Sequence, residues 1–348
     1  MDALSEALST VRMSAAIFFN AEYTAPWGFE APRADEVAPA LAPGVEHIVI
    51  FHLVTEGRAV ARMEGMADVP LEAGDVLIVP HGDKYTVSNG SPDRLRNGAA
   101  SVARFVAGDH STFSYGGGGE QTNFVCGYFG CERQALRLFL AGLARMIKIN
   151  VRGDEAGEWL ESSIRHLVLE TASANPGSMV LLSKMAEALF VEALRRYMAH
   201  LPPEQTGWLA GARDPVVGAA LAVLHRDPCR PWTVPKLAAE VGTSRTVLTE
   251  RFAHFLGEPP INYLSRWRLQ LAARLLEGGH KTMLQVAMDV GYGSEAAFSR
   301  AFKREFGLPP AQYRKRFAER VGGEPMGPAD SGHLSSHPAP EVSGTASA

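Results

Sequence analysis

Two stretches near the end of the chain follow one plan, and this internal repeat constrains the fold more than any other feature. The first reads TVPKLAAEVGTSRTVLTERFAHFLGEPPINYL and the second reads TMLQVAMDVGYGSEAAFSRAFKREFGLPPAQYR. In each, a short segment with small residues ends at Val-Gly, a Ser or Thr follows the turn, and a longer segment leads to Gly-x-Pro-Pro. Glycine permits the positive φ of a tight turn, and Ser or Thr caps a helix N-terminus. The repeat therefore predicts two helix-turn-helix units.

Pro and Gly, taken as helix starts and stops, divide the same region into seven helical segments. These segments run over 215–226, 234–241, 245–256, 260–277, 282–290, 295–306 and 310–316. Because the bridging segment 261–277 separates the repeats, their recognition helices would enter successive major grooves, about 34 Å apart on one face of a duplex. A purely structural helical domain, or a scaffold for protein partners, would explain the helices but not the repeated plan.

Charge is distributed unevenly along the chain. Residues 214–320 hold 16 Lys and Arg against 10 Asp and Glu, whereas residues 1–213 hold 18 against 25. A basic block on an acidic body suggests a polyanionic partner, although an excess of this size can also arise by chance. The cations expected to contact phosphates are Arg251, Arg266, Arg268, Arg274, Lys281, Lys303, Arg304, Lys315 and Arg316.

Residues 214–320 resemble the DNA-binding domain of AraC/XylS-family transcription regulators, most closely in AMDVGYGSEAAFSRAFKREFGLPPAQYRK. The resemblance implies a sequence-specific DNA-binding transcriptional regulator, with double-stranded promoter DNA as its partner and RNA polymerase as a second partner if it activates. It places recognition helices at 245–256 and 295–306. The implied DNA-binding residues are Ser244, Arg245, Thr246, Thr249 and Glu250 in the first unit, and Ser294, Glu295, Ala296, Ser299, Arg300, Lys303 and Arg304 in the second.

Two of these positions carry a specific chemical expectation. Arg300 is the best candidate for a bidentate contact to guanine. Glu250 can accept a hydrogen bond from cytosine, or it can pair with Arg245 or Arg251 instead. The regularly spaced phenylalanines are expected to fill the core rather than stack on bases; they are Phe252, Phe255, Phe298, Phe302 and Phe306.

The N-terminal part reads as β-structure followed by helices. Short apolar runs between turn residues predict strands at SAAIFFN, EHIVIFHLV, GRAVARM, GDVLIVP, YTVSN and SVARFV, in an antiparallel barrel or a double-sheet jelly roll. Helical spacing follows over 132–147, 155–174 and 178–198. The expected class is α+β. The expected divisions are a sensing and dimerisation domain at 1–202, a linker at 203–213, the DNA-binding domain at 214–320 and a disordered tail, rich in Gly, Pro, Ser and Ala, at 321–348.

The N-terminal part also resembles the cupin-like sensory domain of one branch of the same family, through FHLVTEGRAVARMEG, PLEAGDVLIVPHGDKYTVS, TNFVCGYFGCER and the early APW. This resemblance implies a small effector bound inside the barrel or at its mouth. We expect a homodimer formed through the helices of 155–198. The candidate effector-binding residues are His52, His81, Tyr85, Arg104 and Cys126. The effector, the operator and the direction of regulation do not follow from the sequence.

The alternative is a metal-dependent cupin enzyme with a helical appendage. Catalytic cupins hold their metal with a His-x-His pair, whereas His47 and His52 are five residues apart here and no His-x-His occurs. A metal held by His52, His81 and Cys126 is conceivable, but an organic-ligand pocket and buried core histidines are each favoured over it. We therefore expect no enzyme activity, no cofactor and no metal.

The cysteines and the N-terminus bear on the compartment. Cys126 and Cys131 form either a redox switch or two buried thiols, and with Cys229 they make a small, odd set that disfavours a disulfide-rich secreted fold. No apolar run approaches the length of a membrane helix, and acidic residues precede the first basic one. The expected location is the cytoplasm, with no membrane association.

Overall fold

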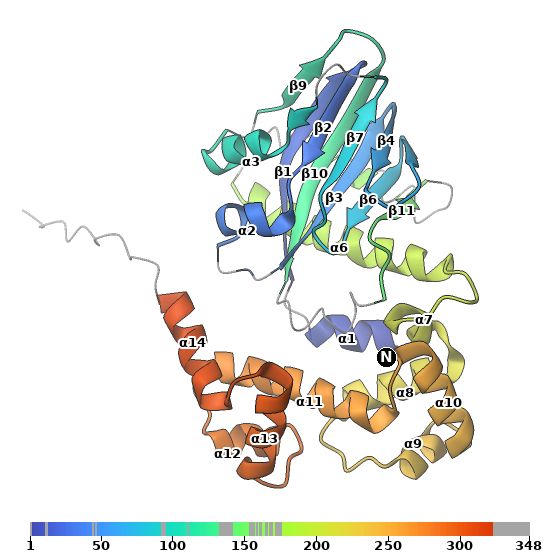
Figure 1. The fold of residues 1–348 in the computed structure, drawn as a ribbon, viewed down its shortest axis with the longest axis vertical. Coiled ribbons are helices and arrows are strands. Elements are labelled where there is room, and N and C mark those ends of the chain that lie inside the picture. Colours follow the sequence, from blue (N-terminus) through green and yellow to red (C-terminus); the bar gives the residue numbers. More distant parts are fainter. Residues whose placement is uncertain are drawn as a thin grey trace, which may run out of the picture.

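The computed structural model places a two-sheet N-terminal unit beside a helical C-terminal unit (Figure 1). The two units are connected by α6 (Ser178–Ala199) and α7 (Trp208–Arg213). The structure describes residues 2–10, 13–43, 45, 47–91, 95–109, 111–131, 142–152, 157, 159, 162–163, 166, 170 and 176–322. No helix among these residues is long and apolar enough to cross a membrane.

In the part of the N-terminal unit that the structure describes, eleven strands form two sheets. The six-stranded sheet has the order β11-β6-β3-β10-β1-β9, with β1 (Met13–Thr24), β3 (His47–Glu56), β6 (Asp75–Val79), β9 (Phe113–Gly116), β10 (Gln121–Cys131) and β11 (Ile147–Asn150). The five-stranded sheet has the order β5-β4-β7-β2-β8, with β2 (Trp27–Ala31), β4 (Arg58–Arg62), β5 (Val69–Glu72), β7 (Tyr85–Asn89) and β8 (Arg96–Asn97). Pairing is antiparallel except between β1 and β9 and between β2 and β8. The α+β class is confirmed, as two separate sheets rather than a closed barrel.

Strand β3 shows why the sequence requires cover on both faces of the larger sheet. Its run HIVIFHLV is apolar at nearly every position, so both sets of alternating side chains must be buried. Ile48, Ile50 and Val54 belong to the core between the sheets. Phe51 and its neighbours on the opposite face belong to the core that includes α6, where the rings of Phe129 and Phe190 lie 4.4 Å apart.

Two of the expected N-terminal elements are wrong. SVARFV is not a strand but the end of helix α3 (Ala99–Val106), which packs against helix α2 (Ala34–Leu41) and buries Val102. The helix expected over 132–147 does not continue to its end, because Ile147 starts strand β11 beside β6. In both places a tertiary contact decides between two local conformations. Residues 132–141 and 323–348 lie outside the described residues.

The remaining helical expectations for the N-terminal part have two outcomes. The helix expected over 178–198 is confirmed as α6. Of the segment 155–174, the structure describes only six residues, and each of these is helical. A further helix, α1 (Ala3–Thr10), precedes the strands and was not predicted from the sequence. It packs against the C-terminal unit.

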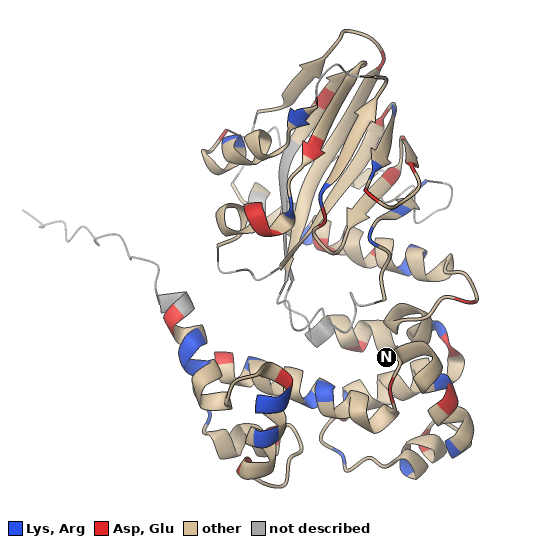
Figure 2. Ribbon diagram, viewed as in Figure 1, with Lys and Arg blue, Asp and Glu red and all other residues tan. Residues whose placement is uncertain are grey.

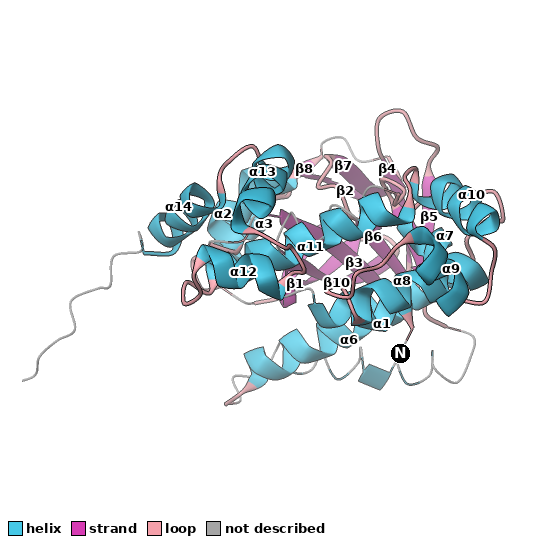
Figure 3. Cartoon of the chain, turned by 90° about the horizontal axis from the view of Figure 1, so that it is seen from below, coloured by secondary structure: helices cyan, strands magenta, loops and turns pink. Residues whose placement is uncertain are grey.

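All seven helices expected in the C-terminal unit are present. They are α8 (Pro215–Arg226), α9 (Val234–Glu240), α10 (Arg245–Leu256), α11 (Pro260–Glu277), α12 (Met283–Asp289), α13 (Glu295–Phe306) and α14 (Pro310–Gly322). Seen from below, α11 runs between a first group formed by α8, α9 and α10 and a second formed by α12, α13 and α14 (Figure 3). Helix α7 lies within the range expected to be a linker and packs against α8 and α10.

Candidate nucleic-acid interface and sensor core

Helices α10 and α13 begin and end in the same way. The Ser244 hydroxyl accepts a hydrogen bond from the backbone N–H of Val247 at 3.2 Å, and the Ser294 hydroxyl accepts one from Ala297 at 3.2 Å. Each helix ends at a glycine in the left-handed region. Matched caps at both ends give the two helices equal length, so the repeat in the sequence is a repeat in structure.

The expected DNA-binding residues lie on the outer side of these two helices. In each helix the opposite side is buried, with Leu248 and Phe252 in α10 and Phe298 and Phe302 in α13. The positions Thr249 and Ser299 are half-buried, and the exposed ones are Ser244, Arg245, Thr246, Glu250, Ser294, Glu295, Ala296, Arg300, Lys303 and Arg304. This separation of faces leaves one polar side of each helix open to a partner. Figure 2 marks where the charged residues occur along these helices.

Most charged side chains of this surface form no ion pair with the part of the chain that the structure describes. Among the residues that the structure describes, Arg245, Arg300, Lys303 and Arg304 form no ion pair. Glu250 also forms no ion pair with any described residue, so the pairing with Arg245 or Arg251 that the sequence allows does not form. Charged groups held in water rather than in ion pairs are available for phosphates and bases.

Several cations expected to contact phosphates are instead used inside the protein. The pairs are Arg251 with Asp214, Arg266 with Glu258, and Lys281 with Asp289. Asp214 is buried and caps α8, because one of its carboxylate oxygens accepts from the N–H groups of Val216 and Val217. Arg251 therefore ties α10 to the start of α8. Lys315 and Arg316 are exposed on α14, and Arg274 is half-buried on α11.

Arg268 of α11 joins the two helix-turn-helix units. Its Nε donates to the carbonyl oxygen of Pro228 at 2.6 Å, and its Nη2 donates to that of Arg230 at 3.0 Å. Both acceptors lie in the loop between α8 and α9 of the first unit. Its Nη1 donates to the carbonyl oxygen of Gly291 at 3.4 Å, in the turn between α12 and α13 of the second unit. One planar guanidinium therefore links the loops that support both recognition helices.

A close backbone approach completes this junction. Gly291 has a φ of +78°, and a Cβ at this position would lie 3.0 Å from the Cα of Cys229. The Cys229 thiol donates to the carbonyl oxygen of Asp289 at 2.7 Å. The turn residue Gly291 thus serves two purposes, since it permits the left-handed backbone and leaves space for the first unit.

A buried polar group stands in the core of the first unit. The Trp208 Nε1–H donates to the Tyr263 hydroxyl at 2.8 Å, which leaves that hydroxyl to donate to Nε2 of His225 at 2.8 Å. The imidazole ring stacks on Trp267 with centroids 4.0 Å apart. Burial lowers the pKa of His225 to about 3, so the ring is neutral.

Three of the five candidate effector residues meet between the sheets. His52 of β3 lies beside Cys126 of β10, with 2.9 Å between Nδ1 and Sγ, and its Nε2 forms a hydrogen bond with the hydroxyl of Tyr85 on β7. Burial lowers the pKa of His52 to about 3 and raises the pKa values of Cys126 and Tyr85. The three groups therefore form an uncharged, hydrogen-bonded connection from one sheet to the other.

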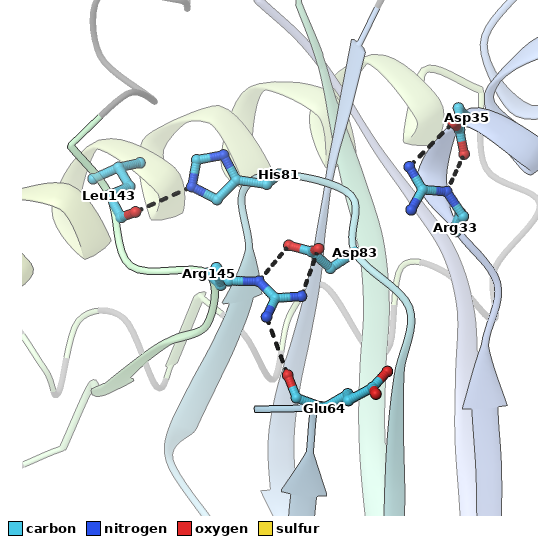
Figure 4. A network of polar contacts seen from close by, with 7 residues as sticks. All are labelled: Arg33, Asp35, Glu64, His81, Asp83, Leu143 and Arg145. Atoms are coloured by element: carbon cyan, nitrogen blue, oxygen red, sulfur yellow. Dashed lines mark hydrogen bonds and ion pairs between the residues drawn. The ribbon is translucent and has the colours of Figure 1, made fainter. Parts of the chain in front are cut away.

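The other two candidates lie elsewhere. The ring of His81 is bonded through Nε2 to the carbonyl oxygen of Leu143 at 3.0 Å, next to an ion pair between Asp83 and Arg145 (Figure 4). Arg104 lies on α3, where it pairs with an aspartate of the following loop. The structure does not bring all five residues to one pocket.

The positions of these residues also decide between the alternatives of a metal site and a redox switch. His81 is separated from His52 and Cys126, and no group of three His, Cys, Asp or Glu among the described residues is close enough to share an ion. Cys126 and Cys131 lie five residues apart on one extended strand, about 16 Å at 3.3 Å per residue. Their Cα atoms are too far apart for a disulfide, which excludes a disulfide switch between them, one of the two alternatives that the sequence left open.

Known proteins are similar to this chain in both of its units. Residues 2–199 match a family model described as Cupin, and residues 237–316 match one described as Helix-turn-helix domain. A protein of Streptomyces lividans, named as an AraC-like transcription regulator, is 31% identical over 318 residues, which cover 90% of this chain and 98% of the relative. The chain belongs to the AraC-like transcription regulators.

Two further proteins are similar to this chain. The transcriptional regulator AlkR of Acinetobacter baylyi is 28% identical over 322 residues, which cover 91% of this chain and 100% of AlkR. A solved structure of the DNA-binding domain of AdpA in complex with a target DNA is 31% identical, covers 33% of this chain and 99% of that chain, and has a TM-score of 0.30. As a member of this family, the chain is a DNA-binding transcription regulator and not an enzyme.

Proposed function

We propose that this regulator reads promoter sequences with the exposed faces of α10 and α13. The observation that carries the proposal is the matched pair of recognition helices, identically capped and each with one polar side open. In this proposal the base-reading residues are those at the N-terminal halves of the two helices, with Arg300 contacting guanine. Lys303 and Arg304 contact phosphates.

We also propose a function for each part of the chain. Residues 1–202 sense a small effector and form the homodimer, 203–213 connect the parts, and 214–320 bind DNA. His52, Tyr85 and Cys126 support an effector role in the interior between the sheets, because they form a buried polar group there. His81 and Arg104, at separate places, remain candidates for the edge of such a site. The proposed location is the cytoplasm, where the protein would meet its DNA partner. If the protein is an activator, it would also contact RNA polymerase.

The experiment that tests the DNA-reading function is selection from random duplexes. Full-length protein is incubated with duplexes carrying about 30 randomised base pairs at low salt, and bound DNA is sequenced. We expect an enriched motif with two blocks whose centres lie about 10 base pairs apart, since two recognition helices enter successive major grooves. Retention without any enriched motif would contradict sequence reading, and absence of retained DNA at low salt would contradict the function itself.

A further inference from the structure

A cavity of about 560 Å³ lies where the sensor unit, the connecting segment and both helix-turn-helix units meet. Residues 142–144, which precede β11, form one wall, and residues 205–208 form the next. The ends of α10 and α11 close the opposite side, and Glu305 in the last turn of α13 reaches the same space. A bound molecule of ordinary metabolite size would therefore touch every part whose relative position matters for DNA binding.

The charged groups on the walls leave an excess of negative charge. Glu258 and Glu305 supply two carboxylates, whereas Arg266 supplies one guanidinium, which pairs with Glu258. Burial raises the pKa of Glu258, and the nearby Glu305 adds to this in the same direction, although Arg266 opposes it. A further positive charge in the cavity would be favoured by both carboxylates.

The uncharged groups on the walls suit an aromatic or apolar body with a polar end. Gln270 is 8% exposed and lines the cavity, and its side-chain amide has no hydrogen-bond partner among the residues that the structure describes. The amide is therefore available to bond a ligand or water in the cavity. Phe255 supplies aromatic surface, which attracts organic cations, and the buried rings of Trp208 and Tyr263 lie in the wall behind it.

We propose that this cavity is a binding site for a small organic cation, an amine with an aromatic or apolar body, held by Glu258 and Glu305, Gln270 and the aromatic walls. The site is separate from the interior between the two sheets, where the sensor candidates His52 and Cys126 lie.

The walls of this cavity are mechanically connected, which gives the site a regulatory consequence. The Gly207 N–H donates to the carbonyl oxygen of Phe255 at 2.8 Å, so the connecting segment is bonded to the end of α10. Gly142 and Gly207 approach so closely that a Cβ on Gly142 would lie 2.6 Å from the Gly207 Cα. A ligand that prefers one arrangement of these segments shifts the presentation of α10 and α13 by its differential affinity. This consequence, unlike the binding itself, rests on the proposed DNA-reading function.

Three probes with one ring and different charges test the site. Tyramine, tyrosol and 4-hydroxyphenylacetate carry a positive, a neutral and a negative end, and each is titrated into full-length protein by isothermal titration calorimetry. We expect tyramine to bind at least tenfold more tightly than tyrosol, and 4-hydroxyphenylacetate to bind most weakly. No binding of tyramine at millimolar concentration, or tighter binding of the anion, would overturn the proposal.

Two wall variants and one matched control locate the binding. Glu305→Gln should weaken tyramine about tenfold and leave tyrosol unchanged, because it removes one charge-assisted contact. Gln270→Leu should weaken both. Glu319→Gln, an exposed change on α14 outside the cavity, should alter neither. Equal tyramine affinity in all three variants would place the ligand elsewhere and refute the site.

DNA binding by the same samples separates the two proposals. If the selected duplex binds normally and tyramine does not bind, the cavity proposal fails and the DNA-reading function stands. If tyramine binds and shows the expected variant pattern while no duplex is retained, the DNA-reading function fails and the cavity proposal stands. If both bind, tyramine should change the affinity for the selected duplex in the wild type, with a smaller change in Glu305→Gln.

Discussion

Arg300 and Lys303 lie three residues apart on α13 and are both exposed, yet we expect them to act differently on DNA. Arg300 lies in the first half of the helix, which in this geometry enters the groove, whereas Lys303 lies nearer the helix end and the backbone. Arg300→Ala should cost about 1–3 kcal/mol at one base position of the selected site. Lys303→Ala should weaken all duplexes alike and reduce the slope of affinity against salt by about one ion.

Fluorescence anisotropy on the selected site, on its single-base variants and on a random duplex measures both effects. Arg195→Ala provides the control, since Arg195 is an exposed arginine on α6, outside the DNA-binding unit. Equal losses for Arg300→Ala on the selected and random duplexes would show that Arg300 contacts phosphate rather than a base.

His225 makes the stability of the first helix-turn-helix unit depend on pH. Its pKa is near 3 in the folded protein, against an ordinary value of 6.5. Between these values the unfolded chain binds more protons, so stability is complete above about pH 6.5 and is lost as the pH falls toward 3. One such histidine contributes a slope of up to about 1.4 kcal/mol per pH unit. The buried His52 acts in the same direction in the sensor unit.

The variant His225→Phe isolates this contribution, because it keeps an aromatic ring and removes the titration. Urea unfolding of the full chain at pH 7, 6 and 5, followed by tryptophan fluorescence, should show a shallower pH dependence than in the wild type. Trp208 and Trp267 surround the substituted ring and report on this unit. His280→Gln, at an exposed position, is the control. Identical slopes for His225→Phe and the wild type would contradict this explanation.

At the scale of elements, the Arg268 junction sets the spacing of α10 and α13. Without it, the second recognition helix must be oriented after the first has bound, so the effective concentration of the second contact falls. Arg268→Ala should therefore weaken a duplex with both half-sites by about tenfold or more, and change little on a duplex in which one half-site is scrambled.

Arg268→Lys separates geometry from charge. Lysine keeps the positive charge but does not present the planar fork that reaches three carbonyl oxygens. We expect its binding to resemble that of the alanine variant on both duplexes, measured by anisotropy. Wild-type binding by Arg268→Lys, or equal losses on the two duplexes, would contradict a role in spacing.

Elements whose boundaries are set by local chemistry could be predicted from the sequence. The start of α12 follows from Thr282 and Gln285, which form a reciprocal capping box, and the end of α13 follows from Gly307. Helix α3 and strand β11 could not be predicted in this way. Their short apolar segments are compatible with either conformation, and packing against α2 or pairing with β6 decides the outcome.

The same distinction holds for the site. The exposed residues of α10 and α13 could be predicted from the repeat. The repeat fixes the ends of each helix and its apolar face, and the residues on the opposite face must then be exposed. The role of Arg268 depends on carbonyl groups up to 40 residues away, and the pairing of Asp214 with Arg251 spans 37 residues. Such partners leave no local pattern. Only the unusual placement of ionisable residues among apolar ones, as at His225, signals a special environment.

At the scale of the whole molecule, one apolar core joins parts that are far apart in the sequence. Ala3, Leu4 and Ala7 of α1 belong to a cluster that extends through α6 and α7 into the first helix-turn-helix unit. The start of the chain is thus packed against α8, on the DNA-binding side (Figure 1). Because of this shared core, packed side chains rather than a free linker connect the N-terminal unit to the first recognition helix.

The outer surface of α6 supports the proposed homodimer. One side of this helix packs on the six-stranded sheet through Phe190 and Ala193, whereas Val180 is 68% exposed and Leu181 is 41% exposed near its start. Trp159, in the segment before α6, is also exposed, at 56%. Large apolar side chains left in water on neighbouring segments are typical of a surface that another subunit covers.

We expect the exposed apolar side chains at the start of α6 to be required for dimerisation. Each exposed aliphatic side chain buried in a dimer contributes about 1.5–3 kcal/mol, so changing Val180→Glu and Leu181→Glu together should weaken association at least hundredfold. Sedimentation velocity of the full-length protein from 1 to 100 µM should show a dimer for the wild type and a monomer for the double variant. Lys236→Glu, an exposed change on α9 outside this surface, should leave the dimer in place, because it adds a negative charge away from the start of α6. A wild type that stays monomeric over this range would refute the dimer, and a double variant that stays dimeric would move the interface away from the start of α6.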